Sequence, residues 1–434
     1  MNSSRIKIAF HTLGCKLNYT ETSTMSRLFP AQEFEVVSSE NGADIYVINT
    51  CSVTGTAERK CRQAIKKFIK QSPEALIAAV GCYAQLRPQA FAAIPGVDLV
   101  LGNCEKFDIA EYIRKYPGKG TPAIHSALLP EKEPYFPAWS VGGRTRSFLK
   151  VQDGCDYNCS YCTVPLARGK SRNQDIASIV REAELIAEKG IKEIVITGVN
   201  TGDFGRSTGE NLAELLKKLV LVKGIERYRI SSIEPNLLTN GIIDIIAGND
   251  KLMPHFHIPL QSGSDRMLGL MRRRYRREMF GQRVNHIRKL MPLAGIGADV
   301  IAGFPGESDS DFNDTFRFIS DMPISYLHVF KYSDRPGTVS EKMTGKIKPS
   351  VKEIRTRKLS ELSDQKHLNF CLLNKGMVSE VLFEGRKGRN LITGFTGNYI
   401  RTEYPRDEKL EGQIRKVVLK ETVPSGNMTA EIID

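Results

Sequence analysis

Short apolar segments alternate with amphipathic segments along the first hundred residues. Four apolar segments are predicted to be strands, at 6–10, 44–50, 75–80 and 97–101. Helical spacing of apolar positions predicts helices between them, such as 58–70 and 88–93. Strands that alternate with helices favour a parallel sheet. The sequence therefore predicts an amino-terminal doubly wound α/β domain over residues 1–130.

The same alternation continues through the middle of the chain. Six further strands are predicted, at 147–151, 192–198, 228–235, 255–261, 297–306 and 326–330. Polar residues and glycines cluster where these strands end, as they do at the rim of a βα barrel. We therefore expect a partial barrel of six βα units over residues 141–370. A linker rich in Pro, Gly and charge is expected before it, at 131–146.

The end of the chain has a different pattern. An amphipathic helix is predicted at 351–373. Short β-rich segments separated by turn signals follow, at 376–383, 391–404, 413–423 and 428–433. This pattern predicts a small carboxy-terminal β-barrel over 371–434. The charge of this segment is nearly balanced, so a local basic patch would have to bind any RNA.

Composition and charge narrow the class of protein. The chain has 434 residues, 41% of them hydrophobic, with one Trp. It lacks a signal-peptide pattern and any run of roughly 18 apolar residues, so we expect a soluble cytoplasmic protein with no membrane contact. In a reducing compartment, the nine cysteines indicate metal or redox chemistry rather than disulfides. The net charge of +13 suggests an anionic partner, most commonly nucleic acid.

Three cysteines lie close together in the loop after the strand at 147–151. Cys155, Cys159 and Cys162 have the spacing C-x3-C-x2-C. A cubane iron–sulfur cluster normally has four thiolate ligands, so three leave one iron free to chelate a substrate or cofactor. A radical S-adenosylmethionine enzyme needs this arrangement. The alternative is a zinc knuckle that lacks its fourth ligand.

A second set of cysteines follows the predicted strands of the first domain. Cys15, Cys51 and Cys82 each stand just past the end of a strand. Ligands of open parallel sheets bind beyond the carboxyl ends of the strands, so these three are predicted to hold a second iron–sulfur cluster. The alternative is that they are buried as small hydrophobic residues. The other cysteines are interpreted as structural thiols: Cys61, Cys104 and Cys371.

Two histidines flank one residue of a predicted strand. His255 and His257 would share a face of that strand, since alternate strand residues do. No third ligand lies nearby in the sequence. We therefore expect a packed pair rather than a metal site.

The motifs around these cysteines resemble the radical-SAM methylthiotransferase family over essentially the whole chain. The last domain is similar to the RNA-binding TRAM module. The segments that carry the resemblance are 12–18 (TLGCKLN), 49–53 (NTCSV), 81–85 (GCYAQ), 153–155 (DGC), 259–264 (PLQSGS) and 298–307 (ADVIAGFPGE).

The resemblance implies two [4Fe-4S] clusters with different tasks. The cluster on Cys155, Cys159 and Cys162 would cleave S-adenosylmethionine to a radical that removes hydrogen from an aromatic C–H bond. The auxiliary cluster on the amino-terminal set would supply sulfur, and a second S-adenosylmethionine the methyl group. Four residues near strand ends are expected to contact the cofactor: Gly198, Asn200, Glu234 and Gln261.

The basic run at 271–277 bears on the substrate. Guanidinium groups bind carboxylates through two hydrogen bonds, and a threonylcarbamoyl group carries a carboxylate. This run, and Lys16, resemble the branch of the family that acts on threonylcarbamoyladenosine. We expect at least one of Arg272, Arg273 and Arg274 to bind that carboxylate, although phosphate or solvent contacts would explain most of the run.

The expected activity is therefore methylthiolation at C2 of threonylcarbamoyladenosine, at position 37 beside the anticodon. The expected partners are a tRNA anticodon stem-loop and an electron donor, and the expected state is a monomer. Two alternatives stay open. One is the same chemistry on isopentenyladenosine or another substrate. The other is a non-catalytic RNA-binding protein with structural metal sites.

Overall fold

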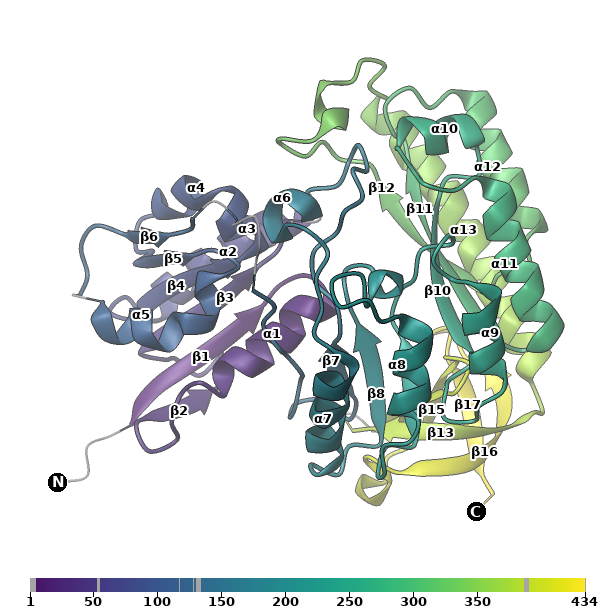
Figure 1. The fold of residues 1–434 in the computed structure, drawn as a ribbon, viewed down its shortest axis with the longest axis horizontal. Coiled ribbons are helices and arrows are strands. Elements are labelled where there is room, and N and C mark those ends of the chain that lie inside the picture. The colour runs from purple at the N-terminus through teal and green to yellow at the C-terminus, as the bar shows by residue number, and fades with distance from the viewer. Residues whose placement is uncertain are drawn as a thin grey trace. The chain divides into compact units, whose positions relative to one another are not determined.

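The computed structural model describes residues 5–52, 55–116, 118–127, 129, 134–385 and 390–433 (Figure 1). The chain divides into two compact units. The first unit comprises Met1–Ser140, Phe148–Gln174 and Ser333–Thr338. The second unit comprises Val141–Ser147, Asp175–Tyr332 and Val339–Asp434. The three-domain division with its boundaries at 130, 141 and 371 stays a prediction.

A six-stranded parallel sheet forms the centre of the first unit, in the order β2-β1-β3-β4-β5-β6. The four predicted strands are confirmed. Two short strands were missed, β2 and β6, which have four and three residues. The strands are β1 (Ile6–Thr12), β2 (Phe34–Val37), β3 (Ile45–Thr50), β4 (Leu76–Gly81), β5 (Leu99–Leu101) and β6 (Ala123–His125).

Helices cover both faces of this sheet (Figure 1). Phe68 of α2 and Phe91 of α4 belong to one apolar cluster, and Met25 of α1 and Ile113 of α5 belong to another. Successive strand residues such as Tyr46 and Val47 divide between the two clusters, as a doubly wound fold requires. The helices are α1 (Lys16–Ser26), α2 (Gly55–Gln71), α3 (Cys82–Leu86), α4 (Pro88–Ala92), η1 (Glu105–Asp108) and α5 (Ile109–Lys115).

The first unit also contains the segment around the C-x3-C-x2-C loop. β7 (Ser147–Lys150) leads into the loop, and the short helix α6 (Val164–Arg168) follows it. Residues 148–174 therefore fold with the amino-terminal sheet.

Parallel strands and helices alternate through most of the second unit, and the predicted fold class is confirmed. β8 pairs with β9, and β10, β11 and β12 form one sheet. β9 and β10 belong to different sheets; an isolated parallel bridge joins Tyr228 of β9 to Leu252, and Ile233 N donates to His257 O of β10 at 3.1 Å. The strands are β8 (Glu193–Thr197), β9 (Arg227–Ile230), β10 (His255–Gln261), β11 (Gly295–Ala302) and β12 (Tyr326–Lys331).

Helices follow each of these strands. Most begin at a side-chain cap, such as Ser308, which forms a capping box with Asp311. They are α7 (Ile176–Ala187), η2 (Thr201–Asp203), α8 (Leu212–Leu219), α9 (Asn240–Ala247), α10 (Asp265–Leu270), α11 (Arg277–Leu290), α12 (Asp309–Asp321), η3 (Val339–Lys342) and α13 (Pro349–Asn374). No helix among the described residues is long and apolar enough to cross a membrane.

The chain ends in a closed β-barrel, as predicted, with the strand order β13-β14-β15-β17-β16. The β-rich segment 391–404 comprises two antiparallel strands with a turn at Gly397 and Asn398. Phe370 and Cys371 of α13 pack into the core of this barrel. The strands are β13 (Val378–Glu384), β14 (Leu391–Thr396), β15 (Arg401–Pro405), β16 (Ile414–Thr422) and β17 (Met428–Ile432), with η4 (Glu408–Leu410) before β16.

Candidate active site

The amino-terminal cysteines lie at the carboxyl ends of three neighbouring strands. Cys15 follows the end of β1, Cys51 directly follows β3, and Cys82 directly follows β4. The Oδ1 atom of Asn18 lies 3.8 Å from Cys15 Sγ and 4.0 Å from Cys82 Sγ. The structure therefore brings these cysteines together at one edge of the sheet.

A glycine lets the first of these loops approach Cys51. Gly14 has a φ of +106°, in the region that favours glycine. A Cβ atom at this position would lie 2.5 Å from Cys51 Cβ and 2.6 Å from Cys51 Sγ. Any other residue before Cys15 would therefore push the two cysteines apart.

Backbone N–H groups point at the sulfurs of the C-x3-C-x2-C loop. Tyr157 N donates to Cys155 Sγ and Val164 N donates to Cys162 Sγ, each at 3.4 Å. Gly154, with a φ of +69°, lies against Lys170, whose carbonyl oxygen would be 1.9 Å from a Cβ atom. Hydrogen bonds to ligand sulfurs help to set the potential of an iron–sulfur cluster.

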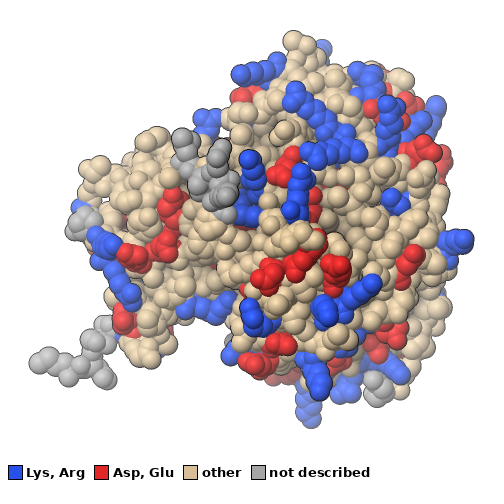
Figure 2. Space-filling view, in the orientation of Figure 1, with Lys and Arg blue, Asp and Glu red and all other residues tan. Residues whose placement is uncertain are grey.

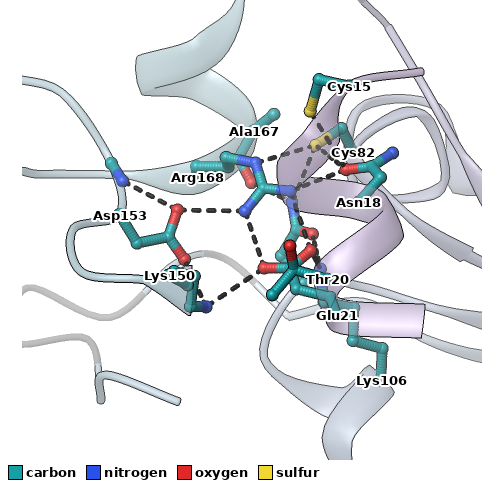
Figure 3. A network of polar contacts seen from close by, with 12 residues as sticks. Cys15, Asn18, Thr20, Glu21, Cys82, Lys106, Lys150, Asp153, Ala167 and Arg168 are labelled. Atoms are coloured by element: carbon teal, nitrogen blue, oxygen red, sulfur yellow. Dashed lines mark hydrogen bonds and ion pairs between the residues drawn. The ribbon is translucent and has the colours of Figure 1, made fainter. Parts of the chain in front are cut away.

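A buried network of charges connects the two cysteine-bearing segments (Figure 3). The guanidinium of Arg168, the last residue of α6, donates from Nε to Cys82 Sγ at 3.2 Å. It also donates to both carboxylate oxygens of Glu21, at 2.9 Å each, and to Asp153 Oδ1 at 3.0 Å. Sequence reasoning missed this network, because its members lie far apart in the sequence, some of them inside motifs and others outside, and no local pattern shows that they meet.

Two lysines complete the network. Lys106 Nζ lies 2.6 Å from Glu21 Oε2, and Lys150 Nζ lies 3.2 Å from both Glu21 Oε1 and Asp153 Oδ2. Burial alone would raise the pKa of Glu21, but Arg168, Lys106 and Lys150 outweigh it and hold that pKa well below its usual range. The pKa of Asp153 is lowered in the same way, against its burial, by Lys150, Arg168 and Arg172. Both carboxylates are therefore charged.

A cleft of about 630 Å³ in the first unit borders both cysteine sets. Ser52, Tyr83 and Thr163 line it, and each directly follows a cysteine. Ser52 Oγ and Thr163 Oγ1 lie 3.5 Å apart. The charged residues that line the cleft are Glu58, Arg62, Arg87 and Arg335. Three guanidinium groups against one carboxylate make the cleft suitable for an anionic ligand.

The residues expected to contact the cofactor lie in the second unit, near the carboxyl ends of neighbouring strands. Gly198 and Asn200 follow β8, Glu234 follows β9, and Gln261 ends β10 with a φ of +65°. Asn200 and Gln261 are buried. Sites of βα folds occupy this edge, but the role of the four residues as cofactor contacts stays a prediction.

The three expected substrate arginines lie between α10 and α11, where Lys and Arg gather on the upper part of the face shown in Figure 2. They differ in environment. Arg273 forms an ion pair with Glu234, and only 3% of its side chain is exposed. Burial raises the pKa of Glu234, and Arg273 opposes that shift. Arg272 and Arg274 are exposed.

Comparisons with known proteins show the family to which this chain belongs. Residues 7–102 match the model of an uncharacterized protein family, UPF0004, and residues 149–319 match the radical SAM superfamily. A protein of Bacillus subtilis called threonylcarbamoyladenosine tRNA methylthiotransferase is 40% identical over 96% of this chain and 94% of its own length. One of the same name from Aquifex aeolicus is 42% identical over 86% of this chain and 91% of its own. The chain belongs to the radical-SAM methylthiotransferases.

Other similarities are weaker. A tRNA-2-methylthio-N(6)-dimethylallyladenosine synthase of Syntrophus aciditrophicus is 31% identical over 95% of this methylthiotransferase and 92% of its own length. Among solved structures, a radical S-adenosylmethionine methyltransferase from Kitasatospora setae superposes with a TM-score of 0.55. It is 16% identical and covers 78% of this chain and 77% of its own. That similarity confirms the fold alone.

The two histidines of β10 lie in different environments in this methylthiotransferase. His255 is packed as expected, with Nε2 2.8 Å from Tyr326 Oη and its ring stacked on Tyr399. The expectation that His257 lacks further ligand atoms is wrong. Its Nε2 lies 2.7 Å from Asp299 Oδ1, and the donor atoms of His257, Asp299 and His328 lie within 4.8 Å of one another. This set has the donor types of a divalent metal site.

Proposed function

We propose that this methylthiotransferase adds a methylthio group to C2 of threonylcarbamoyladenosine at position 37 of tRNA. The observation that carries the proposal is that both three-cysteine sets lie in one compact unit and border the same cleft. Relatives named for threonylcarbamoyladenosine, at 34% to 42% identity, support this substrate over isopentenyladenosine, whose named relatives are 30% to 32% identical.

Each cysteine set would hold one [4Fe-4S] cluster with an open iron. When bound, the clusters and S-adenosylmethionine would supply the one-electron chemistry, the sulfur and the methyl group that acid–base side chains cannot provide. Gly198, Asn200, Glu234 and Gln261 would orient S-adenosylmethionine in the second unit. The protein's own part is to position these groups and to exclude water.

The charged side chains fit a tRNA substrate. The net charge of +13 attracts a polyanion, and the three cleft arginines would hold phosphate or carboxylate oxygens. Arg273 is already neutralised by Glu234. Of the three arginines at 272–274, Arg272 and Arg274 are therefore the better candidates for binding the threonylcarbamoyl carboxylate.

A substrate-exchange assay tests the proposal. The reconstituted enzyme would be given tRNA that carries threonylcarbamoyladenosine or isopentenyladenosine, and the nucleosides would be analysed by mass spectrometry. We expect a methylthio product from the first tRNA only. Product from isopentenyladenosine alone would contradict the proposed substrate, and no product from either would contradict the activity.

Substitutions at the basic run test how the carboxylate is bound. Loss of a charge-assisted contact worth about 1.5–3 kcal/mol should reduce kcat/KM for threonylcarbamoylated tRNA roughly 10- to 150-fold in Arg272→Gln or Arg274→Gln. Arg276→Gln, an exposed neighbour in the same run, is the matched control. If all three variants lose activity equally, the run binds phosphate instead.

Three further parts of the proposal rest on the activity itself. The enzyme would act as a monomer in the cytoplasm and would take its electrons from a separate donor protein.

A further inference from the structure

Every N–H group of the Arg168 guanidinium is directed at a partner. Nε donates to Cys82 Sγ, Nη1 to Glu21 and Asp153, and Nη2 to Glu21 and Asn18, at distances between 2.8 and 3.2 Å. A guanidinium has five N–H groups in a rigid plane. Five contacts therefore fix both the position and the orientation of this side chain (Figure 3).

Arg168 also lies in the segment of the C-x3-C-x2-C loop and contacts a cysteine of the amino-terminal set. It lies six residues after Cys162 in the sequence, at the end of the helix that follows the C-x3-C-x2-C loop. The sulfur it contacts belongs to Cys82, at the end of β4 in the amino-terminal sheet. Its side chain is buried, with 3% exposed.

The charges of the buried network do not cancel. Arg168, Lys106, Lys150 and Arg172 carry four positive charges, and Glu21 and Asp153 carry two negative ones. Arg172 is 11% exposed, and the other five side chains are at most 5% exposed. A buried charge without a counter-ion is costly, and the positive charges of this network outnumber its carboxylates.

A cluster on the amino-terminal cysteines would supply the missing negative charge. A doubly positive cubane with three thiolate ligands carries one net negative charge. The Nε–H group of Arg168 already points at one of the three ligand sulfurs. The sign and the direction of the surplus fit such a cluster.

We propose that Arg168 is a positioning residue for the auxiliary cluster: it is the counter-ion and hydrogen-bond donor at Cys82, and it raises the reduction potential of that cluster. A positive charge and an N–H···S hydrogen bond both stabilise the reduced, more negative cluster. The inference rests on the proposed function, because it requires a cluster on the amino-terminal cysteines.

The experiment compares Arg168→Gln, Arg168→Lys and Arg172→Gln. All three are made in a chain with Cys155→Ala, Cys159→Ala and Cys162→Ala, so that only the auxiliary cluster is present. After anaerobic reconstitution, iron is counted and the midpoint potential is measured by a redox titration followed by EPR. Arg172 is the matched control, since it contacts Asp153 at 3.3 Å in the same network and its guanidinium also donates to the backbone carbonyl oxygens of Pro134, Arg168 and Lys170.

Arg168→Gln is expected to shift the midpoint to more negative potential, Arg168→Lys to restore part of the shift, and Arg172→Gln to change it little. An unchanged midpoint in Arg168→Gln with full iron would overturn the inference. If Arg168→Gln binds no iron, the test rests on Arg168→Lys. A cluster retained in Arg168→Lys with a midpoint potential different from that of the chain with Arg168 supports the inference. Equal loss of iron in Arg168→Lys and Arg172→Gln would show that the network only holds the fold.

Failure of the proposed function has a different result. In that case the unsubstituted chain would bind about four irons and the triple-alanine chain none. If the unsubstituted chain binds about eight irons and the triple-alanine chain about four, the proposed function stands whatever the Arg168 variants show.

Discussion

Glu21 is the side chain on which the buried network most depends. It has no exposed surface and accepts hydrogen bonds from Arg168, Lys106 and Lys150. Glu21→Gln keeps the size of the side chain and removes its charge. The three cations would then face Asp153 as the one remaining carboxylate of the network, and the repulsion among them would increase.

The expected cost is large. Removing one partner of a buried ion pair destabilises a protein by about 3–5 kcal/mol. For a unit of this size, each kcal/mol lowers the unfolding temperature by about 2–4 °C. Glu21→Gln should therefore lower the unfolding temperature of the first unit by roughly 6–20 °C.

The assay is thermal unfolding at pH 7, followed by circular dichroism under anaerobic, iron-free conditions, so that cluster loss does not contribute. Glu40→Gln is the matched control, because Glu40 forms its ion pair with Lys67 at the surface, where more than half of each side chain is exposed. We expect the control to unfold like the unsubstituted protein. If Glu21→Gln also unfolds at the unchanged temperature, the network does not stabilise the fold and the reasoning is refuted.

Three further predictions follow. The pKa values of Glu21 and Asp153 are lowered in the folded protein, so their contribution to the free energy of unfolding is fully present above about pH 4, the pKa of these groups in the unfolded chain. That contribution is lost as the pH falls through the folded-state pKa values. The free energy of unfolding measured against pH should therefore fall in acid, and Glu21→Gln should reduce this dependence. Gly154→Ala should abolish iron binding by its loop, because the new Cβ atom would clash with Lys170. Gly190 has a similar φ of +72° but open space around it, so Gly190→Ala should keep the iron. Iron analysis of both variants therefore separates the effect of the clash from the effect of backbone strain. Alanine at the three cysteines within 155–162 should reduce bound iron from about eight to about four per chain, as counted after anaerobic reconstitution.

Repeating local patterns made much of the fold predictable. The strands β1, β3, β4 and β5 could be identified from their apolar residues and from a glycine or cysteine at the strand end or within two residues after it. β2 and β6 have no such ending. The turn within 391–404 could have been predicted from Gly397-Asn398, a pair typical of hairpins.

Long-range contacts could not be predicted. Arg168 lies 86 residues from Cys82 and 147 from Glu21 in the sequence, and no local pattern relates them. Asp299 and His328 face each other across β11 and β12, but the register of two parallel strands is fixed by packing that the sequence does not show. For that reason the set around His257 was missed.

The first unit is assembled from three separate pieces of the chain, the last of which ends at Thr338. During synthesis, the amino-terminal sheet emerges from the ribosome long before Lys150, Asp153 and Arg168 do. Until then Glu21 and Lys106 have only each other, and the edge of the sheet that carries the cysteines stays uncovered. Exchange of residues 1–130 between relatives would separate Glu21 from its partners in the same way. The segment that must be kept together for this site is therefore the chain as far as residue 338, and not the amino-terminal domain alone.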